Sequence, residues 1–412
     1  MRPVLFVAYY YPPAGGVAVQ RSLKFAKYLP EFGWQPVVLT TTPGAYPARD
    51  ESLWSDVPEN TPIYRVKSYD INGLRGRASR WGAGKLLSAL NLALMLPDAA
   101  LFWSYLARGA VRRILDQHAP ALVYSSSWPA SAHLLARWVK VTYGLPWVAD
   151  FRDPWSENQR MRILPGYRRL HRRLERQVLH DCDRIVTVSE PLAERFQRLA
   201  GPGAEDVLVI ENGYDDSDIA ILPPPRTDRF TITYTGSFSA LHSPAAFVAA
   251  IDLLLANQRI PQEQMRVLIA GPNLEAHIPS RPPFELLGPV PYHSLSALRQ
   301  QSDLMLLVIN EGPEHAGTYG SKLFEYLGSN RPVLALAGRE GVAARLIEQA
   351  RAGAVLPHDP AAIAEAVLGY YQRWQEGHFD HAPDWAVIQR YTRRNLAARL
   401  AAEFDRLAAD RG

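Results

Sequence analysis

The segment 317–327 brings two glycines, a hydroxyl, a cation and a carboxylate together on a few residues. Its apolar residues recur at helical spacing, which predicts a loop, a helix and then, from Pro332 onward, a buried strand. The free amide groups of the first helical turn, with Ser321 and Lys322 as further donors, favour a bound phosphate. Glu325 lies one turn further along, where its carboxylate can accept hydrogen bonds from vicinal ribose hydroxyls. The segment predicts a nucleotide site, and the alternative is a capped helix with a solvated lysine and glutamate.

The composition limits the classes of protein to which the chain can belong. A length of 412 residues predicts two or three domains, and a hydrophobic fraction of 47% supports globular cores. The single cysteine, Cys182, excludes an internal disulfide and a cysteine-based zinc site, and it is consistent with a reducing compartment. The histidines show no HxH or HExxH spacing, so we expect no metal. A net charge of +4 is small for this length and does not indicate nucleic acid as a partner.

Two apolar segments resemble membrane signals. Residues 4–11 are few and lead into Pro12-Pro13 instead of a cleavage site, so we interpret them as a buried strand and expect no signal peptide. The segment 86–107 is interrupted at Pro97-Asp98, and neither half reaches the roughly 20 residues that a membrane span requires. We expect two buried or interfacial helices there, in a cytoplasmic protein.

Strands alternate with helices along the chain. The first strand, at 4–9, leads through the Gly15-Gly16 loop into a helix at 19–31. Further strands are expected at 37–40, 63–66, 121–125, 147–150, 185–188, 207–210, 230–234, 265–270, 304–309 and 332–336, with helices at 131–143, 191–199, 244–256, 294–301 and 385–407. The pattern predicts the α/β fold class, with doubly wound domains at 1–222 and 223–383 that face each other and a C-terminal helical segment at 384–412. The boundary is placed at the proline-rich linker 223–225.

The strand at 147–150 ends in charged residues. Asp150, Arg152 and Asp153 lie at this end, and ligands bind at the carboxyl ends of strands in open parallel sheets. These residues are therefore site candidates, and the alternative is an Arg/Asp ion pair that holds a loop.

Residues 160–176 carry seven arginines and one acid, Glu175, which gives a local charge of +6. A solvated helix face is the simplest explanation. The one-sided charge also suits an anionic membrane surface.

Six short motifs occur in the order found in one glycosyltransferase family, although each is weak by itself. They are Tyr10-Tyr11-Pro12-Pro13 with Gly15-Gly16, 150–155, 183–189, 212–215, 234–237 and 321–327. On these motifs the chain resembles the retaining family 4 group of the GT-B glycosyltransferases over nearly its whole length. The resemblance implies two Rossmann-like domains across a cleft, with a nucleotide-sugar donor held mainly by the C-terminal domain and an acceptor held by the N-terminal one.

The resemblance also implies roles for individual residues. We expect Lys322 and Arg152 to hold the diphosphate charge and Asp153 to orient the acceptor or act as a base. The expected catalytic residues are Asp153, Arg152 and Lys322; the donor-binding residues are Gly15, Gly16, Asn212, Gly236, Ser237, Gly320, Ser321, Lys322 and Glu325; the acceptor-binding residues are Asp150 and Trp155.

The chain departs from the family pattern at two places. Gly317 stands where most members have the first glutamate of an E-x7-E motif, and 237–243 offers only His242 where the family has an arginine and a lysine. Both departures concern contacts to the donor. Separately, the motif 216–218 resembles the metal-binding DxD of another glycosyltransferase fold, and we interpret it as a solvated turn.

These expectations describe a retaining hexosyltransferase that uses a UDP-, GDP- or dTDP-sugar and needs no metal or other cofactor. The expected acceptor is a lipid-linked glycan precursor for a surface polysaccharide or glycoconjugate, and residues 160–176 would hold the enzyme on the inner face of the cell membrane. A non-catalytic nucleotide-sugar-binding protein and a metal-independent epimerase remain as alternatives.

Overall fold

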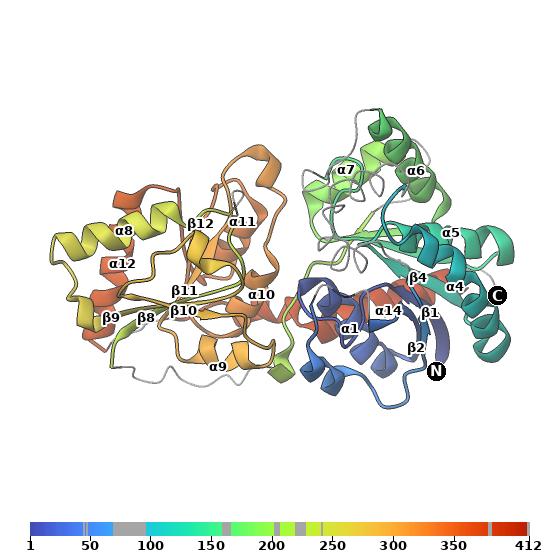
Figure 1. Cartoon of the computed structure of the whole chain (residues 1–412), viewed down its shortest axis with the longest axis horizontal. Coiled ribbons are helices and arrows are strands. Elements are labelled where there is room, and N and C mark those ends of the chain that lie inside the picture. The colour runs from blue at the N-terminus through green and yellow to red at the C-terminus, as the bar shows by residue number, and fades with distance from the viewer. Residues whose placement is uncertain are drawn as a thin grey trace, which may run out of the picture. The chain divides into compact units, whose positions relative to one another are not determined.

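The computed structural model describes residues 1–43, 46, 48–68, 96–158, 166–201, 207–218, 228–239, 242–377 and 381–409. They form two compact units, which Figure 1 shows. Unit 1 contains Met1–Glu211 and Leu396–Gly412, and unit 2 contains Asn212–Asn395. The chain thus passes between units after residues 211 and 395, whereas the predicted boundaries follow residues 222 and 383. The predicted linker at 223–225 lies outside the described residues.

Unit 1 is built on a seven-stranded parallel sheet in the order β3-β2-β1-β4-β5-β6-β7. Its strands are β1 (Arg2–Ala8), β2 (Trp34–Thr41), β3 (Ile63–Val66), β4 (Leu122–Ser126), β5 (Trp147–Phe151), β6 (Arg184–Thr187) and β7 (Leu208–Val209). Its helices are α1 (Val17–Tyr28), α4 (Leu101–His118), α5 (Ser131–Tyr143), α6 (Tyr167–Asp181), α7 (Glu190–Ala200) and most of α14 (Arg393–Ala409).

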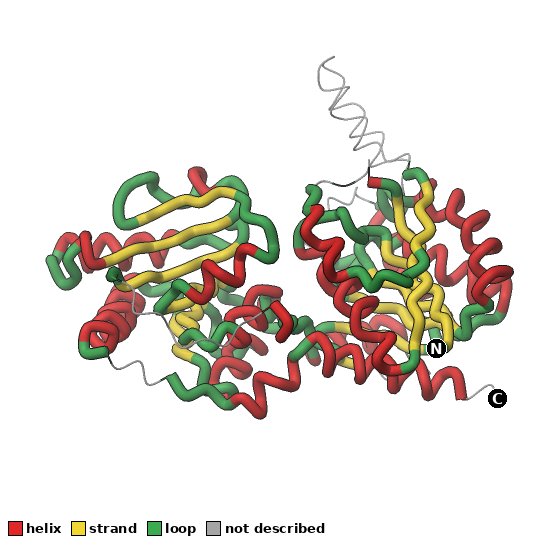
Figure 2. Tube along the Cα trace, turned by 90° about the horizontal axis from the view of Figure 1, so that it is seen from below, coloured by secondary structure: helices red, strands yellow, loops and turns green. Residues whose placement is uncertain are grey.

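Helices cover both faces of this sheet, and Figure 2 shows strands between helices. Alternate residues of a buried strand point to opposite faces. Leu5 and Val7 of β1 therefore pack in a core with α4 and α5. On the other face, Phe404 of α14 lies against Trp34 and Tyr124, with ring centroids 5.3 and 6.0 Å apart. The residues after 395 thus complete the core of unit 1.

Unit 2 contains a six-stranded parallel sheet in the order β10-β9-β8-β11-β12-β13. Its strands are β8 (Phe230–Thr235), β9 (Met265–Ala270), β10 (Phe284–Gly288), β11 (Leu304–Val308), β12 (Val333–Leu336) and β13 (Gly353–Leu356). Its helices are α8 (Ala245–Ala256), α9 (Ser294–Gln300), α10 (Ser321–Gly328), α11 (Val342–Gln349), α12 (Pro360–Gln375) and α13 (Trp385–Ile388). One core joins the sheet to α8 and α12, and another joins it to α10, α11 and α13.

The predicted α/β fold class is confirmed in both units. Two predicted segments lie partly outside the described residues. They are the first half of the apolar segment 86–107 and the start of the basic segment, 160–165. In the described parts, helix α4 begins at Leu101 and helix α6 at Tyr167. No helix within the described ranges has the length and hydropathy required to cross a membrane.

Candidate functional site

The predicted helix in the segment 317–327 is helix α10, and Gly320 at its start lies beside the side chains of Leu307 and Ile309 at the end of β11. Gly320 precedes the helix with a φ of 69°, a left-handed conformation that favours glycine.

No side chain caps the helix start. The amide group of Leu323 donates to the carbonyl of Gly320 at 3.2 Å. The amide groups of Ser321 and Lys322 are left for an anion, and the helix dipole favours a negative charge there.

Lys322 lies against an aromatic side chain from β8. Its Nζ donates a hydrogen bond to the Tyr234 hydroxyl at 2.7 Å and lies 4.0 Å from the centroid of that ring. The Tyr234 ring is itself stacked on Phe238, with centroids 4.1 Å apart. Gly236 leaves the space that the ammonium group occupies, because a Cβ atom at this position would lie 2.8 Å from Nζ. The structure thus brings the predicted residues Gly236 and Lys322 together.

The ammonium group of Lys322 titrates near neutral pH. Burial lowers its pKa to about 7, and the nearby carboxylate of Glu325 opposes this shift only in part. An anion that binds beside Nζ would favour the protonated form. Lys322 can therefore supply a positive charge at the moment when a diphosphate arrives.

Glu325 has a partner that the sequence analysis did not identify. Arg299, in the last turn of α9, donates from Nη1 to Oε2 of Glu325 at 2.7 Å. The Arg299 side chain is only 2% exposed, while Glu325 retains 14% exposure. The carboxylate is therefore held by a buried cation and still reaches solvent. No local spacing connects positions 299 and 325, so only the arginine in an otherwise uncharged helix could have been a signal.

The remaining predicted donor residues of unit 2 lie around this arrangement or at the unit's edge. Ser237 is exposed, and its carbonyl accepts a hydrogen bond from the Tyr234 hydroxyl at 2.9 Å. Ser321 is the first residue of α10 and is half-buried. Asn212 is the first residue of unit 2.

The predicted glycines of unit 1 open helix α1. Gly16 precedes the helix with a φ of 86°. Gly15 packs on the chain itself, because a Cβ atom there would lie 3.2 Å from the Arg49 backbone. Their contact with a donor remains a prediction.

Asp150 differs most from its predicted role as an acceptor ligand. It is fully buried, and its carboxylate accepts hydrogen bonds from Arg21, Tyr124 and Ser126 at 2.7–3.1 Å. Burial by itself would raise the pKa of Asp150, but the guanidinium of Arg21 holds it below the ordinary value. The alternative prediction was an ion pair that holds a loop; the observed partner is instead Arg21 of helix α1, and the geometry favours a structural role for Asp150.

The residues after Asp150 divide between structure and surface. Arg152 donates to the carbonyls of Ser127 and Ala18 at 2.6 and 2.8 Å and thereby joins the segment after β4 to the first turn of α1. Asp153 is exposed and available to a ligand. Trp155 is buried, and its Nε1 donates to His171 at 3.0 Å, so in this state it packs in the core instead of facing an acceptor.

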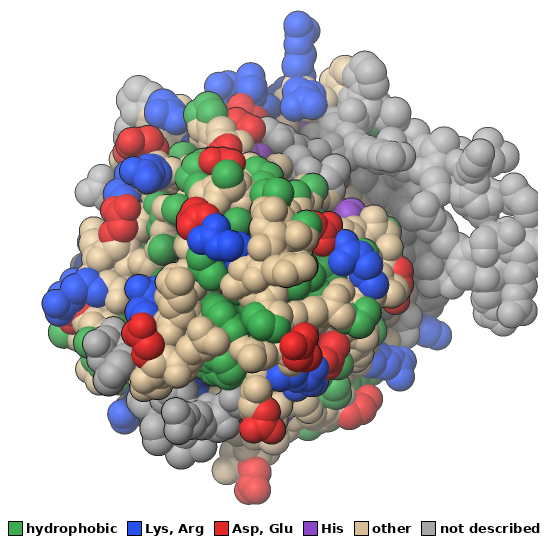
Figure 3. Space-filling model, turned by 90° about the vertical axis from the view of Figure 1, so that its left-hand side faces the viewer, with side chains coloured by type: hydrophobic (Ala, Val, Ile, Leu, Met, Phe, Trp, Pro, Cys, Tyr) green, Lys and Arg blue, Asp and Glu red, His purple; other side chains and the backbone are tan. Residues whose placement is uncertain are grey.

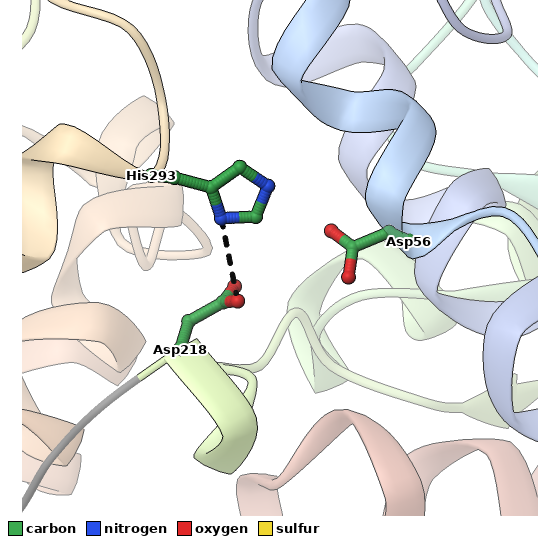
Figure 4. Close-up of side chains that lie close together, drawn as sticks. All are labelled: Asp56, Asp218 and His293. Carbon is green, nitrogen blue, oxygen red and sulfur yellow. Dashed lines mark ion pairs between the residues drawn. The ribbon is translucent and has the colours of Figure 1, made fainter.

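The motif 216–218 forms one short 3-10 turn. Asp216 is exposed, as a solvated turn predicts. Asp218 differs, because its carboxylate lies 3.5 Å from Nδ1 of His293, the ion pair drawn in Figure 4. Asp56, also drawn there, belongs to unit 1 and forms ion pairs with two lysines of α1. The expectation that the protein needs no metal remains a prediction.

Comparison with known proteins finds a family model that matches most of unit 1. Residues 15–213 match the model described as a glycosyl transferase 4-like domain. None of the curated protein sequences matches the chain.

Solved structures share the fold over nearly the whole chain. Sucrose-phosphate synthase from Thermosynechococcus elongatus has a TM-score of 0.66 at 14% identity and covers 100% of both chains. HepE from Anabaena, in complex with UDP-glucose, has a TM-score of 0.65 at 15% identity, and the match covers 98% of this chain and 100% of HepE. UDP-GlcNAc 2-epimerase from Methanocaldococcus jannaschii has a TM-score of 0.57 at 11% identity, and the match covers 98% of this chain and 99% of the epimerase. At these identities the similarity establishes the fold.

Proposed function

We propose that the chain is a glycosyltransferase of the GT-B fold that transfers a hexose from a nucleotide-sugar donor to an acceptor with retention of configuration. The match of residues 15–213 to a glycosyl transferase 4-like domain and the fold shared with sucrose-phosphate synthase support this proposal. The observation that carries the proposal is the arrangement of Lys322, Glu325 and the free start of α10 in unit 2. A cation and oriented amides suit a diphosphate, and a carboxylate one turn away suits a ribose. HepE, which shares the fold, is described in complex with UDP-glucose.

The same groups suit the chemistry of transfer. Cleavage of the sugar–phosphate bond leaves negative charge on the departing diphosphate. Preorganised amide groups and a fixed cation stabilise such charge without a metal. Lys322 gains a proton more readily as that charge develops. Asp153, exposed after β5 in unit 1, is our candidate for orienting or deprotonating the acceptor.

We place the acceptor on a membrane. Five arginines of α6 are exposed, namely Arg168, Arg169, Arg172, Arg173 and Arg176. The acid of that segment, Glu175, is buried and accepts the backbone N–H groups of Trp155 and Ser156. The outer face of α6 is thus basic, whereas basic and acidic side chains are interspersed on the face shown in Figure 3. Near an anionic leaflet each exposed arginine contributes about 1 kcal/mol, which supports a lipid-linked glycan precursor as acceptor.

A donor screen tests the proposed transfer. UDP-, GDP- and dTDP-sugars are each added to the full chain, and the thermal unfolding temperature is measured. A ligand at 100 times its Kd adds about 2.7 kcal/mol of stability, so the donor should raise the transition clearly. Release of nucleoside diphosphate on addition of a polyprenyl-linked acceptor would then show transfer. No stabilisation by any donor would contradict the proposal.

An epimerase is the second candidate, because Gly317 replaces the family's first glutamate and an epimerase shares the fold. It is distinguished by its products. An epimerase converts the donor alone into a second sugar, whereas a transferase forms a glycoside only when acceptor is present.

Liposome sedimentation tests the membrane part. Vesicles with anionic lipid should bind the wild-type chain at low salt, and a variant with glutamate at Arg168, Arg169, Arg172 and Arg173 should stay in the supernatant. The charge-matched control carries glutamate at four exposed arginines of unit 2, namely Arg259, Arg345, Arg351 and Arg373. Equal binding by the α6 variant and the wild type would refute membrane attachment through α6.

A further inference from the structure

The ion pair between α9 and α10 has one fully buried partner and one partly exposed partner. Arg299 is 2% exposed, and removing a guanidinium from water costs several kcal/mol unless a carboxylate compensates it. The compensating group is Glu325, at 2.7 Å, on a different helix. The chain thus keeps a buried charge at a place where an apolar side chain would pack at lower cost.

The geometry of the pair leaves half of the carboxylate free. Arg299 engages Oε2, and no hydrogen bond to Oε1 is present among the described residues. Glu325 keeps 14% exposure, so this second oxygen can meet solvent or a ligand. A carboxylate has about four acceptor sites, which is enough for one guanidinium N–H and two ligand hydroxyls.

The helix α9 that carries Arg299 is anchored independently. Nη2 of Arg331 donates to the carbonyl of Gln300 at 2.8 Å, and Ser302 donates to Thr233 of β8 at 2.5 Å. Arg299 therefore projects from a fixed helix end, and its position fixes the rotamer of Glu325 in turn. Without this contact a glutamate with three rotatable bonds would sample several orientations.

We propose that Arg299 is a positioning residue that holds Glu325 in the orientation in which its free oxygen accepts the ribose hydroxyls of the donor. This inference rests on the proposed nucleotide-sugar function. It assigns Arg299 no contact with the donor. Its effect passes through Glu325, so it should appear only with ligands that have ribose hydroxyls.

Ribose discrimination measures this role directly. The affinities of the full-length protein for UDP, GDP and ADP are measured by calorimetry, and the nucleotide that binds is compared with its 2′,3′-dideoxy form. The wild type should prefer the ribose form by roughly ten- to 100-fold, as expected for hydrogen bonds to a charged group. Arg299→Met should weaken the ribose form by a similar factor and leave the dideoxy form unchanged. Arg299→Lys, which keeps the charge but not the planar guanidinium, should restore part of the preference.

Arg331→Met is the matched control, because Arg331 is equally buried and contacts α9 but not Glu325. It should lower stability and retain the ribose preference. The inference would be overturned if Arg299→Met lost affinity equally for the ribose and dideoxy forms, or if its preference for the ribose form were unchanged. If Arg299→Met does not fold, Arg299→Lys is the deciding variant. A preference for the ribose form as strong as that of the wild type in Arg299→Lys would also overturn the inference. A wild type that binds both forms alike overturns the inference alone, whereas one that binds no nucleotide overturns the proposed function with it.

Discussion

The two units each combine a cation with a carboxylate beside their parallel sheets, but they use these charged residues differently. In unit 1, Asp150 and Arg21 neutralise each other in the interior, with side-chain exposures of 0% and 1%. In unit 2, Lys322 rests on an aromatic ring without a full counter-ion, and Glu325 keeps an exposed oxygen. The first arrangement stabilises the fold, and the second leaves unsatisfied charge for a ligand.

The comparison shows that the residue type at a strand end does not decide between structure and function. Burial of both partners decides it, because a buried pair has no capacity left for a ligand. In unit 1, Asp150 was predicted to bind the acceptor and Arg152 the diphosphate of the donor. Both side chains already form hydrogen bonds inside the unit. Four substitutions test this distinction.

Asp150→Asn should have the largest effect, on stability. The asparagine has the same shape but leaves the Arg21 guanidinium buried without its counter-ion, which should cost about 3–5 kcal/mol. Because the pKa of Asp150 is lowered in the folded state, its contribution is present above the ordinary pKa of an aspartate and is lost as the pH falls toward the folded value. Chemical denaturation at pH 7 measures the change. An unfolding midpoint like that of the wild type would remove Asp150 from the structural class.

Glu325→Gln should weaken nucleotide binding by about 1.5–3 kcal/mol, because a charged acceptor is lost at the ribose. The glutamine oxygen can still accept from Arg299 but no longer neutralises its buried charge, so we expect a lower stability with the fold retained. Calorimetry with the donor found in the screen measures the affinity, and circular dichroism checks the fold. Unchanged affinity would place Glu325 outside the donor site.

Nucleotide affinity should depend on pH through Lys322. With a pKa of about 7 in the free protein, Lys322 is mostly neutral above this pH and must take up a proton to pair with a diphosphate. Affinity should therefore fall by up to about tenfold per pH unit between pH 7 and 9. Calorimetry in buffers of different ionisation enthalpy would detect the proton uptake. Lys322→Met should bind more weakly at pH 7 and show no such slope, and a slope that persisted in this variant would assign the titration to another group.

Asp153→Asn should have the smallest effect on stability, within about 0.5 kcal/mol, because the side chain is exposed. Turnover should nevertheless fall if this carboxylate orients or deprotonates the acceptor. Denaturation and product formation are measured on the same preparation. Full turnover in the variant would exclude Asp153 from the chemistry, and a large loss of stability would place it with Asp150.

Helices and strands were predicted well where a short stretch of sequence contains the whole pattern. Strand β9 and helix α5 have the predicted bounds, since one is a largely apolar run and the other a helical repeat between turn residues. Strand β3 also has the predicted bounds, although it is a half-buried edge strand. The predicted fold is likewise confirmed, and residues 15–213 match a glycosyl transferase 4-like domain, in agreement with the resemblance. Strands β10 and β13 were not predicted. They form the two edges of the sheet in unit 2, where partial exposure weakens the apolar pattern. Helix α12 was also missed, although Asp359 and Pro360 mark its start.

Site residues were predictable where one segment supplies them. Lys322 and Glu325 follow from a single loop and helix, whereas the partners that define their environment come from β8 and α9. Arg299 is 26 positions from Glu325, and Arg21 is 129 positions from Asp150. No spacing rule connects such pairs, because the contact exists only after the sheets have formed.

The division of unit 1 into two sequence segments determines the order in which the molecule can be completed during synthesis. All residues of unit 2 leave the ribosome before residues 396–412, which supply Phe404 to the core beside Trp34. Unit 1 therefore begins first and finishes last, and its apolar face remains uncovered while unit 2 emerges. A nascent chain that stops shortly after residue 395 would carry a complete unit 2 beside a unit 1 with an exposed aromatic surface, the kind of surface that chaperones recognise.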